Sequence, residues 1–220
     1  MGELHQTVFH DQHVGLGAKM VEFGGWHMPV FYPAGIVDEH LATRKGAGLF
    51  DVSHMGRFVI KGKDGLPFLQ HVLTNNAEAI DPREVGAQYT FIPNKTGGAV
   101  DDAFLYRFVA DEYLLVVNAS NREKDWAHLQ SLIGDFNDVE MTDRTVDIAM
   151  LALQGPESRQ ILENCIESGA RPEPMRNTVS TVVIAGTEVK VARTGYTGEP
   201  LCFELFCPWA DGPRLWDFLI

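Results

Sequence analysis

Residues 97–108 read GGAVDDAFLYRF. Paired glycines suit a tight turn, and the alternating residues after them predict a β-strand. Successive side chains of a strand point to opposite faces, so Asp102 shares one face with Phe104 and Tyr106. Asp101 points to the other face, where we interpret it as a residue that caps a turn. A carboxylate in line with two aromatic rings suits a planar ligand that carries amine groups.

The segments on either side of this strand mix strand and helix patterns. Strand patterns cover residues 57–61, 88–92, 113–117, 148–153, 179–184 and 188–192. Helix patterns cover 36–45, the segment after Asp64, the segment from Ser120 to Ile133 and the segment after Pro156. Ser120 and Glu123 have the spacing of a capping box. The mixture predicts an α+β fold with mostly antiparallel sheets and flanking helices.

A second segment with chemical potential is RTGYTGEPLCFEL, residues 193–205. Its glycines bracket Tyr196 and Thr197, which predicts a loop that a ligand can approach closely. Glu204 follows in a strand pattern. A pterin presents an N–H and an NH₂ side by side, and a carboxylate is an acceptor with two oxygens that match this edge. Glu204 is therefore a candidate pterin reader, although a surface glutamate between Phe203 and Leu205 has the same pattern.

Composition and charge exclude several other classes of site. A formal net charge of −12 without any run of Lys or Arg argues against nucleic acid as a partner. No apolar run is long enough to span a membrane. The eight histidines and three cysteines lack metal-type spacing, so we expect no metal, reduced thiols, and loop positions for His10 and His13. Asp51, Ser53 and His54 are too close together to form a catalytic triad.

Together these segments resemble the aminomethyltransferase family, the T-proteins of the glycine cleavage system. The blocks that carry the resemblance are GAKMVEFGGWHMPVFY (17–32), LFDVSHMGRF (49–58), GGAVDDAFLYRF (97–108), LLVVNASNREKDW (114–126), LALQGPES (151–158) and RTGYTGE (193–199). The family implies a tetrahydrofolate-binding fold of three domains. We expect a discontinuous first domain, residues 1–55 and 146–220, with a smaller α+β domain, residues 56–145, inserted in it.

The chain ends in GPRLWDFLI, an apolar helix pattern without a capping residue. We therefore expect a fragment that lacks the family's C-terminal β-barrel domain. The family's arginine that clamps the glutamate tail of folate would lie beyond residue 220. With no signal peptide, we expect the protein in the cytoplasm, or in the mitochondrial matrix if it is eukaryotic and processed.

The resemblance implies a reaction and a set of site residues. Family members convert aminomethyl-dihydrolipoyl H-protein and tetrahydrofolate to methylenetetrahydrofolate, ammonia and dihydrolipoyl H-protein. The implied partners are therefore the lipoylated H-protein and tetrahydrofolate as acceptor, with no metal. Asp102 corresponds to the family's essential aspartate, which is consistent with its strand face. The implied folate-binding residues are Met55, Tyr89, Tyr106, Asn118, Tyr196 and Glu204.

Two points stay open on the sequence alone. The segment Pro200–Cys202 is one residue longer than in many members, which leaves the register of Glu204 open. The function could also be that of another folate-dependent one-carbon enzyme, such as a demethylase or a dimethylglycine or sarcosine type. A non-catalytic folate-binding relative is a further alternative, but that branch carries a cysteine signature where this chain has RTGYTGE.

Overall fold

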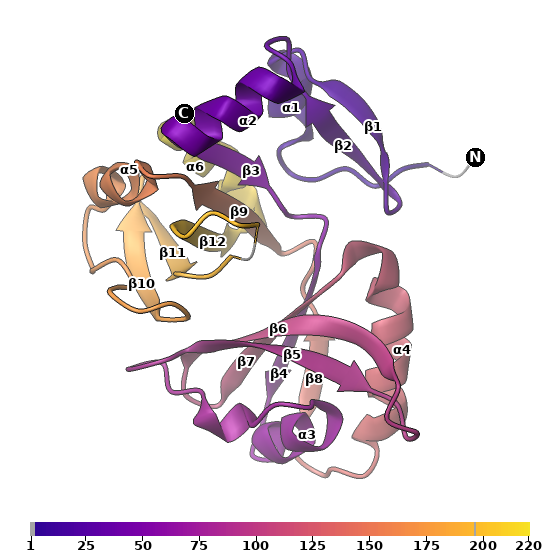
Figure 1. The fold of residues 1–220 in the computed structure, drawn as a ribbon. Helices are drawn as coiled ribbons and strands as arrows, with labels where there is room; N and C mark the ends of the chain where they lie inside the picture. Colours follow the sequence, from indigo (N-terminus) through magenta and orange to yellow (C-terminus); the bar gives the residue numbers. More distant parts are fainter. Residues whose placement is uncertain (1–2, 196) are drawn as a thin grey trace. The chain divides into compact units, whose positions relative to one another are not determined.

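Two five-stranded sheets, each with its own hydrophobic core, organise the chain (Figure 1). The computed structural model describes residues 3–195 and 197–220. One unit consists of Met1–His54, Val146–Glu173 and Ser180–Ile220, and the other of Met55–Thr145 and Pro174–Val179. The short segment Pro174–Val179, which the sequence-based division left in the first domain, packs with the second unit. There Val179 fills the space that Gly86 leaves by having no side chain.

The sheet of the first unit has the strand order β10-β11-β12-β9-β3. Its strands are β3 (Gly48–Asp51), β9 (Ile148–Gln154), β10 (Val179–Ile184), β11 (Thr187–Ala192) and β12 (Cys202–Pro208). Strand β12 pairs antiparallel with β11 on one side and with β9 on the other, and β9 pairs antiparallel with β3. A separate hairpin joins β1 (Lys19–Phe23) to β2 (Trp26–Phe31).

The helices of the first unit are α1 (His10–Gly15), α2 (Ile36–Lys45), α5 (Ser158–Cys165) and α6 (Gly212–Leu219). Buried residues of α5 and α6, Leu162 and Trp216 among them, join the strands in one core. Helix α2 contributes no buried residue. The sequence placed His10 and His13 in a loop, and this was wrong: both lie in α1, and His13 is buried.

The second unit contains the sheet β5-β6-β7-β4-β8. Its strands are β4 (Gly56–Lys61), β5 (Ala87–Pro93), β6 (Ala99–Val109), β7 (Glu112–Val117) and β8 (Glu140–Asp143), and all pair antiparallel. Helices α3 (Gly65–Val72) and α4 (Arg122–Ile133) bury Phe68, Leu69 and Leu129 against it. This is the expected α+β arrangement of antiparallel sheets with flanking helices.

The start of α4 differs from the capping box that the sequence predicted. A short 3-10 turn, Ala119–Asn121, precedes the helix and contains Ser120. The N-cap is Asn121, and its side chain makes no capping hydrogen bond. The turn shifts the helix start by about one residue, so Ser120 and Glu123 are not at the positions where they could cap each other. The same turn places Asn118 directly after β7, where it reaches β6.

Candidate functional site

Asp102 lies on β6, and two polar side chains bind its carboxylate. The Tyr89 hydroxyl donates a hydrogen bond of 2.9 Å to Asp102 Oδ2 from the neighbouring strand β5. Asn118 Nδ2, at the end of β7, donates one of 3.0 Å to Asp102 Oδ1. Both carboxylate oxygens therefore have a fixed donor, and three adjacent strands supply the group. The hydrogen bond to Asp102 raises the pKa of the Tyr89 phenol, because the bond requires its proton.

Aromatic rings lie beside this carboxylate on the same sheet face. Tyr89 is 41% exposed and Phe91 43% exposed, and their rings meet edge to face with centroids 5.5 Å apart. Phe104 lies next to Tyr89 at 6.3 Å, and Tyr106 next to Phe104 at 5.1 Å. Tyr106 itself is buried, so it packs beside Phe104 and offers little exposed surface. The exposed rings of Tyr89 and Phe91 form an aromatic surface beside Asp102.

Asp101 is not the turn cap that the sequence suggested. It lies inside β6, where neighbouring side chains alternate between the two faces of the strand. Its Oδ1 accepts a hydrogen bond of 3.1 Å from Asn118 Nδ2, the same amide nitrogen that binds Asp102. A single amide group therefore bridges the two neighbouring carboxylates. Asp101 Oδ2 is buried and has no donor among the hydrogen bonds formed by the described residues.

Asp125 of α4 is the residue that the sequence analysis missed. Its side chain is fully buried, and none of the described residues donates a hydrogen bond to either of its carboxyl oxygens. Burial raises the pKa of the Asp125 carboxyl to about 8, and the neighbouring Asp101 carboxylate, to which Asp125 can donate only when protonated, adds to the rise. Lys124 lowers this pKa in part, with its Nζ 4.0 Å from Asp125 Oδ1. In the sequence, Asp125 reads as one more polar residue in the first turn of a helix, which gives no signal of burial.

Glu204 lies on β12 of the first unit, between Ala152 of β9 and Ala192 of β11. Its neighbours Phe203 and Leu205 are fully buried, whereas Glu204 is half-buried on the other sheet face. The Thr194 hydroxyl donates a hydrogen bond to Glu204 Oε2. An ionised carboxylate has acceptor positions for several donors, and alanine neighbours crowd it little, so Glu204 is suited to accept further hydrogen bonds from a ligand.

The loop before β12 depends on Gly195. Its φ is +133°, and a Cβ at this position would lie 2.6 Å from Cys202 Sγ. Only glycine fits such a close approach, so Gly195 lets the start of the RTGYTGE loop pack against the Cys202 side chain. Tyr196, which the resemblance places in the folate site, lies outside the described residues.

Met55 stands at the start of the second unit, one residue before β4. Gly56 pairs with Val117, so Met55 and Asn118 lie at the same end of two paired strands. The backbone there is held by Arg57, whose buried guanidinium donates a hydrogen bond of 2.7 Å to the Met55 carbonyl and another to the Thr145 carbonyl. Arg57 is thus a structural support that the strand pattern alone did not suggest.

A second buried polar network lies in the first unit, centred on Asp51. His13 Nε2 is 3.1 Å from Asp51 Oδ2, and the Thr7 hydroxyl donates to the same oxygen at 2.6 Å. His13 Nδ1 is 2.8 Å from the Tyr32 hydroxyl. Burial would raise the pKa of Asp51, but the hydrogen bonds from His13, Thr7 and the Ser53 amide outweigh it and hold this pKa below its ordinary value. The network ties α1 and the end of β2 to β3.

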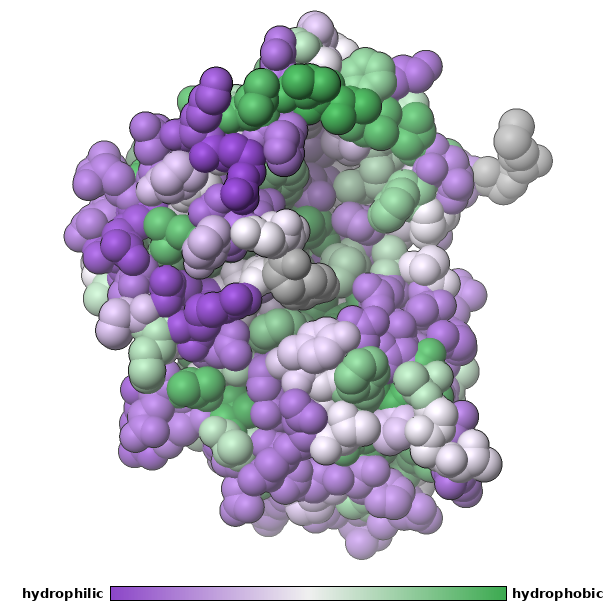
Figure 2. All heavy atoms as spheres, in the orientation of Figure 1, coloured by the Kyte–Doolittle hydropathy of each residue, from purple (hydrophilic) through white to green (hydrophobic). Residues whose placement is uncertain are grey.

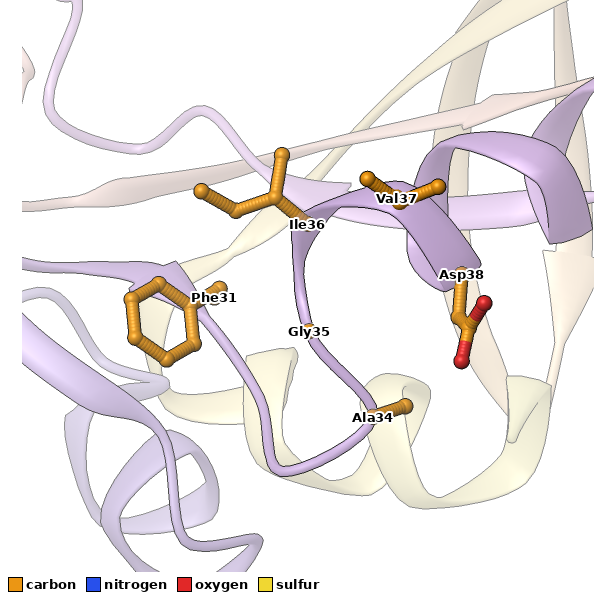
Figure 3. A pocket seen from close by; sticks show the side chains of 6 residues that line it. All are labelled: Phe31, Ala34, Gly35, Ile36, Val37 and Asp38. Carbon is orange, nitrogen blue, oxygen red and sulfur yellow. The ribbon is translucent and has the colours of Figure 1, made fainter.

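The first unit also has a pocket of about 370 Å³ at the turn from β2 into α2 (Figure 3). Its lining residues are Phe31, Ala34, Gly35, Ile36, Val37 and Asp38. Hydrophobic side chains gather in a band over this part of the first unit (Figure 2), and Ile36 and Val37 are 61% and 70% exposed. The pocket contains none of the site residues expected from the sequence.

The described residues offer neither a metal cluster nor a membrane span. Across 3–195 and 197–220, no three or more His, Cys, Asp or Glu side chains are grouped in a way that could hold a metal ion. Within the same ranges no helix is both long and apolar enough to cross a membrane.

Comparison with known proteins relates these features to a family. The model of the GCVT N-terminal domain matches residues 9–220. The aminomethyltransferase of Deinococcus deserti is 44% identical over 99% of this chain and 59% of its own length. The aminomethyltransferase of one Thermus thermophilus strain is 46% identical over 99% of this chain and 60% of its own length.

Solved structures extend this comparison to the fold. The glycine cleavage system aminomethyltransferase T from Bartonella henselae superposes with a TM-score of 0.87 and 31% identity, over 99% of this chain and 57% of that one. The heterotetrameric sarcosine oxidase of Corynebacterium sp. U-96 shares the fold, with a TM-score of 0.58 at 19% identity, over 83% of this chain and 88% of that one. The chain thus spans about 59% of the length of its curated relatives. By this match over nearly all of its residues, the chain belongs to the aminomethyltransferase family, the glycine cleavage T-proteins.

Proposed function

We propose that the protein is a tetrahydrofolate-dependent aminomethyltransferase of glycine cleavage. The observation that carries the proposal is Asp102, a carboxylate held by Tyr89 and Asn118 beside exposed aromatic rings. These residues suit a flat, nitrogen-rich ligand. The exposed aromatic side chains can stack on the ligand, and the Asp102 carboxylate can accept hydrogen bonds from its N–H groups or stabilise positive charge on it. The family to which the chain belongs supplies the identity of the reaction.

In the proposed reaction the carbon of the aminomethyl group changes both of its heteroatom partners. Its bonds to the amine nitrogen and to the lipoyl sulfur break, and bonds to N5 and N10 of tetrahydrofolate form. Ammonia and the dihydrolipoyl thiol leave, and they take up the protons released from the two folate nitrogens. Asp102 stabilises the positive charge that develops on the folate nitrogens, or relays one of these protons.

Glu204 takes the role of reading the pterin edge in this proposal. Its carboxylate can accept from the adjacent N–H and NH₂ donors, and Thr194 orients it. The proposed partners are tetrahydrofolate and a lipoylated H-protein. We propose Tyr89, Tyr106, Asn118 and Met55 as further folate-site residues, with Tyr106 acting through Phe104 because it is buried.

The test is a reconstituted transfer assay with the protein in its full length. Lipoylated H-protein loaded with the aminomethyl group, together with tetrahydrofolate, should yield ammonia and methylenetetrahydrofolate in equal amounts. Dimethylglycine and sarcosine, each with tetrahydrofolate, are the control donors. Product from a control donor alone would assign the protein to another folate-dependent one-carbon reaction. Folate binding without product from any of the donors would make it a binding protein.

A further inference from the structure

Two carboxyl groups in the second unit share one amide, and a third carboxyl lies next to one of them. Asn118 Nδ2 lies 3.0 Å from Asp102 Oδ1 and 3.1 Å from Asp101 Oδ1. Asp125 approaches Asp101 from α4. The chain of contacts therefore runs from Asp125 through Asp101 and Asn118 to Asp102.

The innermost atoms of this cluster are all acceptors. Asp101 Oδ2 and both carboxyl oxygens of Asp125 are buried, and no N–H or O–H of the described residues donates to them. Burying unpaired acceptors costs about 1–3 kcal/mol per group, and more when they are charged. A proton on one of the two carboxyls removes the problem, because it converts an acceptor into a donor and neutralises one of two facing charges.

The geometry decides which carboxyl carries the proton. Asp101 receives the amide of Asn118, and a donated hydrogen bond favours the ionised form. Asp125 is fully buried without such a donor, which favours its neutral form. The charged groups around Asp125 are Asp101 and Asp102 on β6 and the half-exposed Lys124 on α4.

Two groups of α4 that could carry a proton, Lys124 and His128, are engaged elsewhere. Lys124 Nζ is 4.0 Å from Asp125 Oδ1 and donates its short hydrogen bond, 2.7 Å, to the Val100 carbonyl instead. One turn along α4, the His128 ring faces the Pro93 carbonyl at 3.1 Å. Neither group therefore supplies the proton that the buried pair needs.

We propose that Asp125 is a positioning residue. At neutral pH its carboxyl is protonated and donates a hydrogen bond to Asp101, and through Asn118 this contact keeps Asp102 in place. The reactive role of Asp102 in this inference rests on the proposed function. The proton on Asp125 removes one negative charge from beside Asp101 and Asp102. Loss of that proton removes a donor and adds a third negative charge to the cluster. Since burial raises the pKa of Asp125 to about 8, this loss occurs just above neutral pH.

The first test follows the protons directly and needs no reaction. In the full-length protein labelled with ¹³C at the aspartate carboxyls and ¹⁵N at the asparagine side chains, the Asp125 carboxyl should titrate near pH 8. The Asn118 side-chain amide should shift in the same step. In Asp125→Asn the step at Asn118 should disappear, because the new amide still donates to Asp101 but does not ionise. A carboxyl of Asp125 that is already ionised at pH 6, or an Asn118 amide that does not respond, would overturn the proposal.

The second test uses the transfer reaction. From pH 7 to pH 9 the wild-type rate should fall roughly ten-fold, as expected for one ionisation near pH 8, and Asp125→Asn should fall less than about two-fold over the same range. Glu123→Gln, which removes an exposed carboxylate two residues earlier on α4, is the matched control and should keep the wild-type profile. The same alkaline fall in Asp125→Asn as in wild type would contradict the positioning role.

A replacement variant covers the case in which Asp125→Asn does not fold, and the titration separates failure of this inference from failure of the proposed function. If Asp125→Asn does not fold, Asp101→Asn replaces it, and the Asp125 carboxyl should then titrate at a lower pH because its charged neighbour is gone. An unchanged titration in that variant would refute the pairing with Asp101. A wild-type protein with no transfer at any pH would refute the proposed function, whereas the coupled titration of Asp125 and Asn118 would still decide the proton assignment and its link to the bridging amide.

Discussion

The Tyr89 hydroxyl reaches Asp102 diagonally across two paired strands. Tyr89 lies opposite Phe104 in the β5–β6 register, and Asp102 lies opposite Phe91, yet the 2.9 Å hydrogen bond joins Tyr89 to Asp102. Diagonal partners on one face of an antiparallel pair are within reach of a long aromatic side chain. The bond therefore depends on the strand register, and it fixes the carboxylate relative to the aromatic surface.

Asp102→Asn should separate binding from catalysis. The substitution removes the charge but leaves the strand and the rings, so tetrahydrofolate affinity should change only a few-fold. Turnover should fall by roughly 10²-fold or more, as expected for the loss of a group that stabilises charge in the transition state. Titration of tetrahydrofolate and steady-state kinetics on the same preparations measure the two effects.

Asp101→Asn is the comparison for that variant. Asp101 lies next to Asn118 and Asp125, and its side chain points to the opposite face of the strand from that of Asp102. Its loss should therefore reduce turnover much less than the loss of Asp102. Two variants with the same kinetic defect would mean that the strand faces have been assigned the wrong roles.

Tyr89→Phe should have a smaller and purely kinetic effect. The ring stays, and only the hydroxyl that donates to Asp102 is removed. A hydrogen bond to a charged group contributes about 1.5–3 kcal/mol, so turnover should fall by about ten-fold or more while tetrahydrofolate affinity is nearly unchanged.

Phe91→Leu makes the opposite change, because it removes an exposed ring and leaves the hydrogen bond between Tyr89 and Asp102. It should weaken binding several-fold with turnover retained. A loss of affinity in Tyr89→Phe equal to that in Phe91→Leu would argue against this division of roles.

The strand pattern around Asp102 predicted much of this part of the fold. Alternation placed Asp102 and Phe104 on one face, and the structure has them there, because successive side chains of a strand point to opposite faces. The helix at 36–45 was also predicted with its observed ends. The hairpin of β1 and β2 was not recognised, although Gly24 and Gly25 between two apolar runs are a strong turn signal, and both have positive φ.

The contacts that the sequence could not predict are those between distant segments. Asp125 meets Asp101 across 24 positions, and nothing in the helix pattern of α4 shows that this aspartate faces inward. His13 and Asp51 are still further apart in sequence, and their pairing depends on how α1 lies against β3. The spacing of apolar residues in the sequence indicates which face of a helix or strand is buried, whereas a single buried polar pair produces no repeating pattern.

Asp51→Asn should destabilise the first unit in a pH-dependent way. Asp51 accepts hydrogen bonds from Thr7, the Ser53 amide and the His13 ring, and an amide cannot accept all of them, so the free energy of unfolding at pH 7 should fall by about 1–3 kcal/mol. The folded-state pKa of Asp51 is lowered, so its stabilisation is present above the unfolded value of about 4 and is lost as the pH falls through the folded value. The difference between wild type and variant should therefore shrink below about pH 4.

Denaturant unfolding at pH 7, 5 and 3 measures that difference. Asp11→Asn, an exposed carboxylate on the same helix α1 as His13, serves as the control and should behave as wild type at all three pH values. A constant gap between Asp51→Asn and wild type down to pH 3 would show that the ionised carboxylate is not what stabilises the network.

Glu204→Gln tests the proposed pterin reader. The amide places a donor where the carboxylate offered an acceptor to the pterin N–H groups, and it removes the charge, so tetrahydrofolate binding should weaken by about 1–3 kcal/mol. Thr194→Val is the matched variant: it keeps Glu204 ionised but removes the hydroxyl that orients it, and it should weaken binding less. Calorimetric titration of both variants gives the ranking. An unchanged affinity in Glu204→Gln would mean that the Pro200–Cys202 segment has shifted the register relative to other family members, and that a different acid reads the pterin.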